Sequence, residues 1–320
     1  MHSTARGPSL GGCRMWHYDD SRAAMRDALR LSRAMTYKSA VAGLPLGGGK
    51  GVIMLPATVD TRLRRAALRD FGDTVEQLGG SYITAEDVGT SAKDMEAIAE
   101  RTKYVTGLSR RRGGSGDPSP WTALGVEASI RASLERKLGS PDPKGRTIVV
   151  NGLGHVGFAL AKLLAKAGAE LIVADIDRSK RALADRLGAR WISPAKTLTQ
   201  AADVLAPCAL GGILDHETVP RLQVPIVAGA ANNQLADDPI ADLLADRGIL
   251  WAPDFVANAG GIINISVELE RSGYDPDRAR VKVNGIGDTM RHIYDLAQSD
   301  SDTPFSAALG LAARRVAEAG

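Results

Sequence analysis

Two lysines in the first fifty residues are the side chains best suited to acid–base chemistry. Lys38 ends the run Met-Thr-Tyr-Lys, late in a helical pattern, and Lys50 ends the run Gly-Gly-Gly-Lys. Three glycines let backbone and ligand approach closely, and they leave the Lys50 ammonium as the only functional group of that loop. A lysine removed from water has a lowered pKa and can then act as a base. Taken alone, the run also fits a glycine turn followed by a surface lysine.

The composition indicates a soluble enzyme of the α/β class. The 320 residues are enough for two domains, and the net charge of +3, from 40 basic and 37 acidic residues, argues against nucleic acid or a membrane surface as partner. Two cysteines, Cys13 and Cys208, favour a reducing cytoplasm over a disulfide framework. No apolar run reaches transmembrane length, and the N-terminus lacks the layout of a signal peptide. The histidines and cysteines show no metal-ligand spacing, so no metal is expected.

Helices and short strands alternate in the first part of the chain. A helix is expected from residue 21 to 35, after an N-cap at Asp20 or Ser21. Further helices are expected over 62–78, 92–101 and 121–138, and short buried strands over 52–55 and 81–84. The second strand delivers Asp87 just past its carboxyl end. A polar linker over 139–146, with two prolines, indicates a domain junction.

A dinucleotide-binding pattern follows this linker. A β-branched strand over 147–150 leads into Gly152, Gly154 and Gly157, which open a helix, and a second strand covers 171–175. The first glycine makes the tight turn, the second admits a pyrophosphate and the third lets the helix pack on the strand. The helix N-terminus offers N–H groups to the phosphates. Asp175 ends the second strand, where a carboxylate binds the ribose hydroxyls and repels a 2′-phosphate, so the pattern predicts NAD rather than NADP.

Three further strands are predicted, and each leads to small or amide residues. They cover 203–207, 225–229 and 249–253, and Cys208, Asn232 and Asn258 follow them. Ligands bind outside the carboxyl ends of strands in open α/β sheets. Glycine and asparagine are also the ordinary residues of turns. The sequence leaves both interpretations open for these segments.

Six short motifs occur in a fixed order and cover nearly the whole chain. They are Leu-Gly-Gly-Cys-Arg-Met at 10–15, Met-Thr-Tyr-Lys at 35–38, Gly-Gly-Gly-Lys at 47–50, Glu-Asp-Val-Gly-Thr at 86–90, Ala-Pro-Cys-Ala-Leu-Gly at 206–211 and Asn-Ala-Gly-Gly at 258–261. Together they resemble the glutamate/leucine/phenylalanine/valine dehydrogenase family, and its leucine and phenylalanine branches most closely. The resemblance implies reversible, NAD-dependent oxidative deamination of an L-amino acid to a 2-oxo acid and ammonia.

The resemblance also implies the domain organisation. An α/β substrate and oligomerisation domain is expected over 1–125, with C-terminal helices of about 289–320 returning to it. A Rossmann NAD-binding domain is expected over 126–288, and the substrate in the cleft between the two domains. A homo-oligomer is expected. The family normally begins with a helix and a strand before the segment matched here, which implies either a late annotated start or an abbreviated first domain.

Roles for the reacting groups follow from the same resemblance. Lys38 would pair with the substrate carboxylate. Lys50 would bind the carbonyl or carbinolamine oxygen and activate the attacking water, with its pKa lowered in part by Lys38. Asp87 would exchange protons with the leaving amino group. These three side chains form the expected catalytic centre.

The resemblance assigns the remaining contacts to other motif residues. Asn258 would orient the substrate amine and Thr122 the nicotinamide amide, while Asn232 and the backbone near Cys208 would line the cofactor side. The substrate pocket would further include Leu10, Gly11 and Met35.

Substrate specificity is left open among apolar amino acids, with leucine-like substrates first. Leu10 would narrow the pocket as in the leucine-like branch, whereas Gly287 resembles some phenylalanine-type members. One pocket methylene is worth only about 1–3 kcal/mol of discrimination, so leucine, valine and phenylalanine all stay possible. Glutamate is disfavoured because no extra basic residue is placed for its side chain. A non-catalytic NAD-binding regulatory or structural protein is the alternative of another class.

Overall fold

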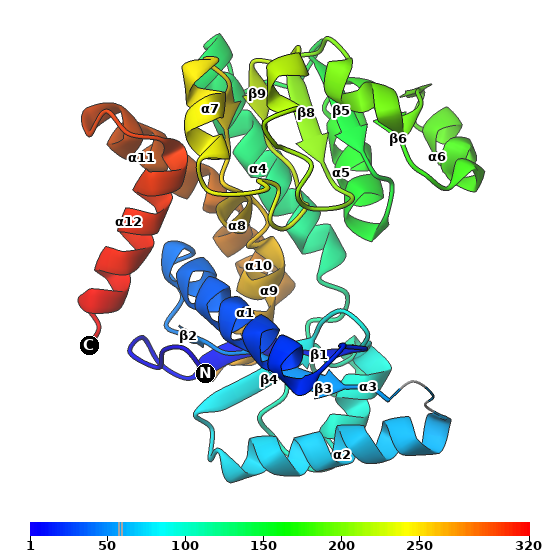
Figure 1. Ribbon diagram of the computed structural model, residues 1–320, viewed down its shortest axis with the longest axis vertical. Helices are drawn as coiled ribbons and strands as arrows, with labels where there is room; N and C mark the ends of the chain where they lie inside the picture. Colours follow the sequence, from blue (N-terminus) through cyan, green and yellow to red (C-terminus); the bar gives the residue numbers. More distant parts are fainter. Residues whose placement is uncertain (57, 59) are drawn as a thin grey trace. The chain divides into compact units, whose positions relative to one another are not determined.

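The computed structural model describes residues 1–56, 58 and 60–320, which divide into two compact units (Figure 1). The first unit comprises Met1–Pro118, Ile262–Ala279 and Ala312–Gly320, and the second comprises Ser119–Gly261 and Arg280–Leu311. Each unit contains a parallel sheet of its own.

The sheet of the first unit is organised around strand β1 (Ser9–Trp16). On one side β1 pairs in parallel with β4 (Tyr82–Glu86), and on the other with β2 (Gly47–Gly48) and then β3 (Gly51–Met54). The sequence pattern predicted β3 and β4 but no strand over residues 9–16. The glycines at positions 11 and 12 lower the β-propensity of the segment that becomes the central strand.

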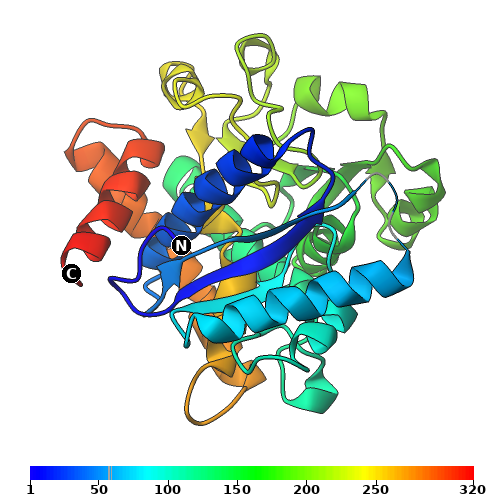
Figure 2. The same ribbon diagram turned by 60° about the horizontal axis from the view of Figure 1, so that its bottom comes forward.

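Helices cover both faces of this sheet. Figures 1 and 2 show α1 (Ser21–Val41) on one side and α2 (Thr61–Gln77) on the other, with α3 (Ala92–Ile98) beside α2. The side chain of Asp20 accepts a hydrogen bond from a backbone N–H of the first turn of α1 at 2.7 Å, which confirms it as the N-cap. The helix continues six residues past its predicted end at residue 35. This extension carries Lys38 into the last turn.

Glycines of the edge strands let these helices approach the sheet closely. A Cβ at Gly48 would lie 2.0 Å from the backbone nitrogen of Thr36 in α1, and one at Gly51 would lie 2.4 Å from the ring of Phe71 in α2. Larger residues would push both helices away. The glycine-rich run therefore has a packing function in addition to its chemical one.

The second unit contains a six-stranded parallel sheet in the order β10-β9-β8-β5-β6-β7. Its strands are β5 (Thr147–Asn151), β6 (Glu170–Ala174), β7 (Arg190–Trp191), β8 (Val204–Pro207), β9 (Ile226–Val227) and β10 (Leu250–Trp251). Taken in chain order from β5, this is the 3-2-1-4-5-6 arrangement of dinucleotide-binding folds, which reverses direction between β5 and β8. The Rossmann prediction is confirmed.

Helices of the second unit pack around α4 (Ser119–Leu138). It contacts α5 (His155–Lys166), α8 (Asp254–Ala257) and α11 (Ile286–Ser299). The second unit also contains α6 (Arg181–Arg186) and α7 (Ile240–Asp246), with short 3₁₀ helices at Arg178–Lys180, Pro194–Thr199 and Val219–Arg221. The 3₁₀ helix Arg110–Arg112 belongs to the first unit, and the residues of α9 (Gly260–Glu268), α10 (Pro276–Asn284) and α12 (Pro304–Ala317) are divided between the two units.

The division of the chain differs from the expected one at α4, at residues 262–279, which group with the first unit, and at residues 289–311. Helix α4 belongs wholly to the second unit, so the polar linker over 139–146 lies inside that unit. Residues 289–311, expected to return to the first domain, group with the second because α11 packs on α4, where the Tyr294 hydroxyl lies 2.6 Å from Ser133 Oγ. Residues 312–320 do join the first unit, where Arg315 donates to the carbonyl of Ala40 at 3.1 Å.

Two features are absent from residues 1–56, 58 and 60–320. Within these residues, no helix combines the length and apolar character needed to cross a membrane. In the same part of the chain, no three His, Cys, Asp or Glu side chains are grouped so as to hold a metal ion.

Candidate active site

Lys50 lies in the short gap between β2 and β3, where the edge of the first sheet is interrupted. The backbone around it is packed closely, since a Cβ at Gly11 of β1 would lie 1.8 Å from the carbonyl oxygen of Gly49. The Tyr82 hydroxyl donates to the Gly11 carbonyl at 2.6 Å from the neighbouring strand. Only glycine fits at these positions. The lysine is thus held by a rigid wall of backbone.

The Lys50 ammonium forms an ion pair with the carboxylate of Asp87. Its Nζ lies 2.7 Å from Asp87 Oδ2, and the lysine side chain is only 5% exposed. Burial lowers the pKa of Lys50, and the negative charge of Asp87 opposes this effect. The nearby cation that contributes most to the lowering is Arg14, whereas the sequence analysis expected Lys38. A buried lysine next to a carboxylate can give up and regain a proton without large motion.

Arg14 is a site residue that the sequence analysis did not single out. Its Nε donates to Asp87 Oδ2 at 3.0 Å and its Nη1 to Asp27 Oδ2 at 2.9 Å. The Tyr18 hydroxyl donates to the same oxygen of Asp27 at 2.7 Å. The sequence feature that could have indicated Arg14 is its position inside the motif at 10–15. In that motif it follows the glycines that let β1 approach Asp87. The result is a chain of alternating charges that ends at Lys50.

The turn after β4 holds Asp87 in a fixed position. Its backbone N–H donates to Thr90 Oγ1 at 2.9 Å, and that hydroxyl donates to the carbonyl of Cys13 in β1 at 2.9 Å. Gly89 has φ +82°, and a Cβ there would lie 1.8 Å from the carbonyl oxygen of Met15. The turn therefore requires glycine and is fastened directly to β1.

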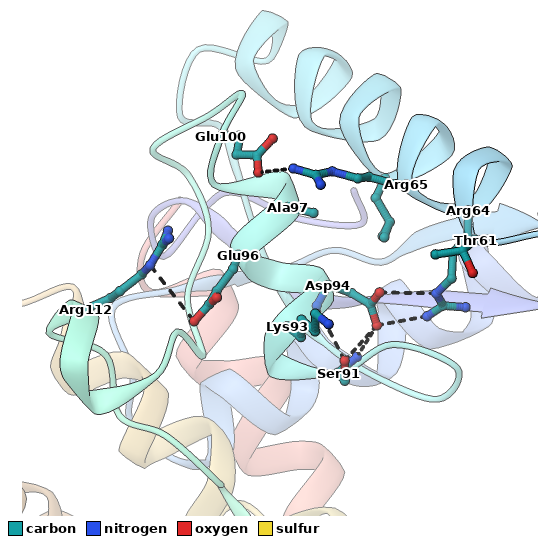
Figure 3. A pocket seen from close by; sticks show the side chains of 11 residues that line it. Thr61, Arg64, Arg65, Ser91, Lys93, Asp94, Glu96, Ala97, Glu100 and Arg112 are labelled. Carbon is teal, nitrogen blue, oxygen red and sulfur yellow. Dashed lines mark hydrogen bonds and ion pairs between the residues drawn. The ribbon is translucent and has the colours of Figure 1, made fainter.

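A hollow of about 500 Å³ lies between α2 and α3, and one of its lining residues holds the same turn (Figure 3). Arg64 in its lining pairs with Asp94 at 2.8 Å and donates to the carbonyl of Gly89 at 2.7 Å. Arg65 pairs with Glu100 at 2.7 Å across the hollow. These arginines and carboxylates neutralise one another, so they offer no unpaired charge to a ligand. We interpret the residues of the hollow as holding the Asp87 turn in place.

The residues expected to bind the substrate belong to the same unit as this ion pair. Leu10 is buried in β1, and Gly11 follows it. Met35 and Lys38 are half-buried on α1, the helix that contacts β1, β2 and β3. One unit thus carries the two lysines, Asp87 and the expected pocket residues.

The glycines at 152, 154 and 157 in the second unit have the geometry of a pyrophosphate loop. Gly152 has φ +106°, which only glycine adopts readily, and a Cβ at Gly157 would lie 1.9 Å from the Gly152 carbonyl oxygen. An added Cβ at Gly154 would instead meet nothing within 4 Å. Gly154 is also the N-cap of α5, whose first N–H groups have no side-chain cap. The open space at that N-terminus fits a dinucleotide phosphate.

Asp175 follows β6 directly and is almost fully buried. Its Oδ2 accepts hydrogen bonds from the backbone N–H of Leu153 at 2.7 Å and from Lys180 Nζ at 2.9 Å. Its Oδ1 accepts from the backbone N–H of Asp177 at 2.9 Å. Burial opposes ionisation, but the three donors outweigh it and lower the pKa of the carboxyl. The group is therefore an anion ready to accept hydrogen bonds.

Two asparagines assigned to different ligands lie together in this unit. Asn258 Nδ2 donates to Asn232 Oδ1 at 2.9 Å and to the carbonyl of Ala230 at 3.1 Å. The sequence analysis placed Asn258 on the substrate and Asn232 on the cofactor. Thr122 is close to the same segment, since a Cβ at Gly260 would lie 3.2 Å from its Cα. The three residues thus come from segments that are far apart in the sequence.

Two further residues near this cluster have supporting positions. Cys208 follows β8, where its N–H donates to the carbonyl of Asn151 at 2.8 Å, and burial raises the pKa of its thiol to about 12. Gln234, which the sequence analysis missed, is fully buried and donates to the carbonyl oxygens of Gly229 and Ala231 at 3.0 and 3.1 Å. Its Oε1 accepts a hydrogen bond from the Trp251 indole N–H at 3.1 Å. Gln234 belongs to none of the six motifs, so the sequence did not mark it. It fixes the loop that carries Asn232.

Models of protein families match nearly the whole chain. Residues 1–104 match the model described as Glu/Leu/Phe/Val dehydrogenase, dimerisation domain, and residues 172–320 match Glutamate/Leucine/Phenylalanine/Valine dehydrogenase. Residues 126–211 match the NAD binding domain of D-isomer specific 2-hydroxyacid dehydrogenase.

Individual relatives and a solved structure agree with these matches. The chain is 45% identical to the leucine dehydrogenase of Thermoactinomyces intermedius, covering 99% of this chain and 86% of that one. It is 42% identical to the valine dehydrogenase of Streptomyces virginiae, covering 100% and 89% of the two chains. The crystal structure of L-tryptophan dehydrogenase from Nostoc punctiforme superposes with a TM-score of 0.87 at 39% identity, covering 100% of this chain and 91% of that one.

Proposed function

This chain belongs to the glutamate/leucine/phenylalanine/valine dehydrogenase family, and from that premise we propose which residues carry its reaction and which substrate it prefers. It is an NAD-dependent dehydrogenase that oxidatively deaminates apolar amino acids. The alternative of a non-catalytic NAD-binding protein finds no support in these relatives. The observation that carries the proposed roles is the buried ion pair between Lys50 and Asp87.

Lys50 is the proposed base. Oxidation at Cα yields an imino acid, and water must lose a proton as it attacks this carbon. A lysine whose pKa is lowered by burial can accept that proton, and its ammonium form then stabilises the oxygen that develops on the carbon.

Asp87 is the proposed proton carrier for the amino group. It already contacts Lys50 at 2.7 Å and Arg14 at 3.0 Å through one oxygen. Arg14 is the proposed positioning residue, because it donates to the Asp87 carboxylate and is itself paired with Asp27. Proton transfer needs such fixed geometry, with donor and acceptor within hydrogen-bond reach.

Lys38 and Asn258 are proposed to hold the two polar groups of the amino acid. A compact ammonium suits the substrate carboxylate, and the Asn258 side chain suits the amine. Leu10, Gly11 and Met35 are proposed to line the pocket for the apolar side chain of the substrate.

The second unit is proposed to hold NAD through groups already arranged for it. When bound, NAD takes up the hydride that leaves the substrate Cα. Gly154 leaves space for the pyrophosphate, and Asp175 accepts hydrogen bonds from the adenosine ribose. Thr122, Asn232 and the backbone near Cys208 are proposed to contact the nicotinamide side, with Gly152 and Gly157 shaping the loop.

Leucine is the proposed first substrate, with valine next. Leu10 gives the expected pocket an apolar residue, and relatives that carry the names leucine and valine dehydrogenase are 45% and 42% identical to this chain. Phenylalanine is the runner-up, because Gly287 has no side chain and in this resembles some phenylalanine-type members.

The test is steady-state NADH formation with leucine, valine, phenylalanine, tryptophan and glutamate, each at saturating NAD. We expect the highest kcat/KM with leucine and the lowest with glutamate. A preference of about tenfold or more for phenylalanine or tryptophan would overturn the substrate assignment while leaving the reaction in place. NADH binding without turnover on any of the five would overturn the deaminase proposal itself.

We also propose a cytoplasmic homo-oligomer. The match of residues 1–104 to a dimerisation domain supports self-association. The raised thiol pKa values of Cys13 and Cys208, both about 12 through burial, fit cysteines that persist as unreactive thiols. Sedimentation velocity with the full chain would test the assembly, and a single monomeric species at micromolar concentration would refute it.

A further inference from the structure

The carboxylate of Asp175 is already engaged by three donors of this chain. Two of them are backbone N–H groups, from Leu153 at 2.7 Å and Asp177 at 2.9 Å. The third is the ammonium of Lys180 at 2.9 Å, five residues further along in the 3₁₀ helix Arg178–Lys180. The lysine side chain is 29% exposed and the aspartate only 8%. Lys180 is therefore the only one of these three donors that belongs to a side chain, and that side chain is partly exposed to solvent.

The number of acceptor positions makes Lys180 a competitor of the cofactor. An ionised carboxylate offers about four lone-pair positions, and three are in use here. A ribose that donates both of its hydroxyls to Asp175 needs two. The backbone donors are fixed by the glycine loop and by the turn after β6, whereas the lysine ends a flexible side chain. Lys180 is the donor that has to move when the ribose binds.

We propose that Lys180 sets the discrimination between NAD and NADP in this enzyme, by competing with the NAD ribose for Asp175 and by offering a cation to a 2′-phosphate. The proposal rests on the assignment of Asp175 to the ribose made above. It makes this chain more tolerant of NADP than the aspartate alone would make it.

The chemistry of the 2′-position supports this assignment. A phosphate monoester carries a charge of about −1.5 to −2 at neutral pH, which an unpaired aspartate repels strongly. An ammonium 2.9 Å from the same carboxylate reduces that repulsion and can hydrogen-bond the phosphate oxygens. The nearby Asp177 is engaged by Ser179, whose N–H and Oγ lie 3.0 and 2.6 Å from its Oδ1. Arg178 is exposed and adds a second positive charge to the same segment.

The test compares kcat/KM for NAD and NADP, and the dissociation constants of NADH and NADPH, in the full-length protein and in Lys180→Met. We expect the NAD:NADP ratio of kcat/KM to rise at least about tenfold in Lys180→Met, because NADP loses a charge-assisted hydrogen bond to its 2′-phosphate. NADPH binding should weaken and NADH binding should tighten or stay the same. Lys196→Met is the matched control, an exposed lysine of the same unit, and should leave the ratio unchanged. An unchanged or lower ratio in Lys180→Met would overturn the proposal.

A second pair of variants separates this inference from the assignment of Asp175. Asp175→Asn should weaken NADH binding and strengthen NADPH binding, and adding Lys180→Met should remove the gain in NADPH. If Asp175→Asn leaves NADH binding unchanged, the ribose assignment fails and the competition mechanism fails with it. If NADH binding weakens as expected but the double variant keeps its full NADPH gain, only the role of Lys180 is overturned.

Discussion

Replacing Arg14 with glutamine should shift the pH dependence of turnover upward. The change removes one positive charge beside Lys50 but keeps a side-chain donor that can face Asp87. Arg14 contributes to lowering the pKa of Lys50, behind the larger effect of burial. Without the guanidinium that pKa rises, so a smaller fraction of the lysine is neutral at a given pH. The reaction then needs a higher pH to reach the same rate.

The size of the shift follows from the distances at Asp87. The nitrogens of Lys50 and Arg14 lie 2.7 and 3.0 Å from the same oxygen, so they are close neighbours. Two unit charges separated by roughly 6 Å repel by about 3 kcal/mol at an effective dielectric constant of about 20, and by about 0.7 kcal/mol in bulk water. Arg14 and Asp87 are each 21% exposed, so an intermediate value applies. At about 1.4 kcal/mol per pH unit, we expect the pKa of Lys50 to rise by about 1.

The assay is kcat for leucine deamination across the neutral and alkaline range at saturating leucine and NAD. The rising limb should move upward by about one pH unit, with roughly a tenfold loss at the acid end and recovery at high pH. Arg14→Lys keeps the charge and should keep the midpoint. Arg22→Gln removes an equal charge from the exposed face of α1 and should leave the profile unchanged. A lower plateau with an unmoved midpoint would show that Arg14 acts only through folding, and would refute the electrostatic argument.

Three further variants test the site and the fold separately. Gly154→Ala should keep the melting temperature, because its Cβ meets nothing within 4 Å, yet weaken NADH binding in calorimetry by about tenfold or more; unchanged binding would refute the pyrophosphate loop. Gly157→Ala should lower the melting temperature, since its Cβ would lie 1.9 Å from a backbone oxygen, and an unaltered melting temperature would contradict that packing. Lys50→Met should reduce kcat by about 10²–10⁴ while NADH binding persists, and near-normal turnover would exclude it as the base.

The sequence motifs indicated candidate reacting groups more clearly than the sheet that holds them. The glycine runs, Lys50, Asp87 and Asp175 all stand in motifs with a recognisable order. The motif at 10–15 did not reveal strand β1, because its glycines lower the β-propensity of a segment that pairs with three other strands. Those same glycines are required by the close approach of Asp87, where a Cβ at Gly12 would lie 2.7 Å from its Cβ.

The domain division shows a second limit of local sequence patterns. A proline-containing linker over 139–146 resembles a junction, but it joins α4 to β5 within one unit. The true change of unit at Pro118 and Ser119 falls where a loop enters α4. Which unit a helix joins depends on the partners of its apolar face, and Tyr294 of α11 finds its partner on α4.

The sequence by itself determined which chemical groups this protein carries. The glycine loop at 152–157, Asp175 at the end of a strand and Lys50 after three glycines each need specific residue types at a fixed spacing. Only the tertiary structure decided how those groups are tuned. Arg14 reaches Asp87 across 73 positions of the chain, and this contact alters the electrostatic environment of Lys50. Lys180 contacts Asp175 across a turn whose shape cannot be read from the sequence. Charges interact through space, so their effect on one another depends on distances that residue order alone does not contain.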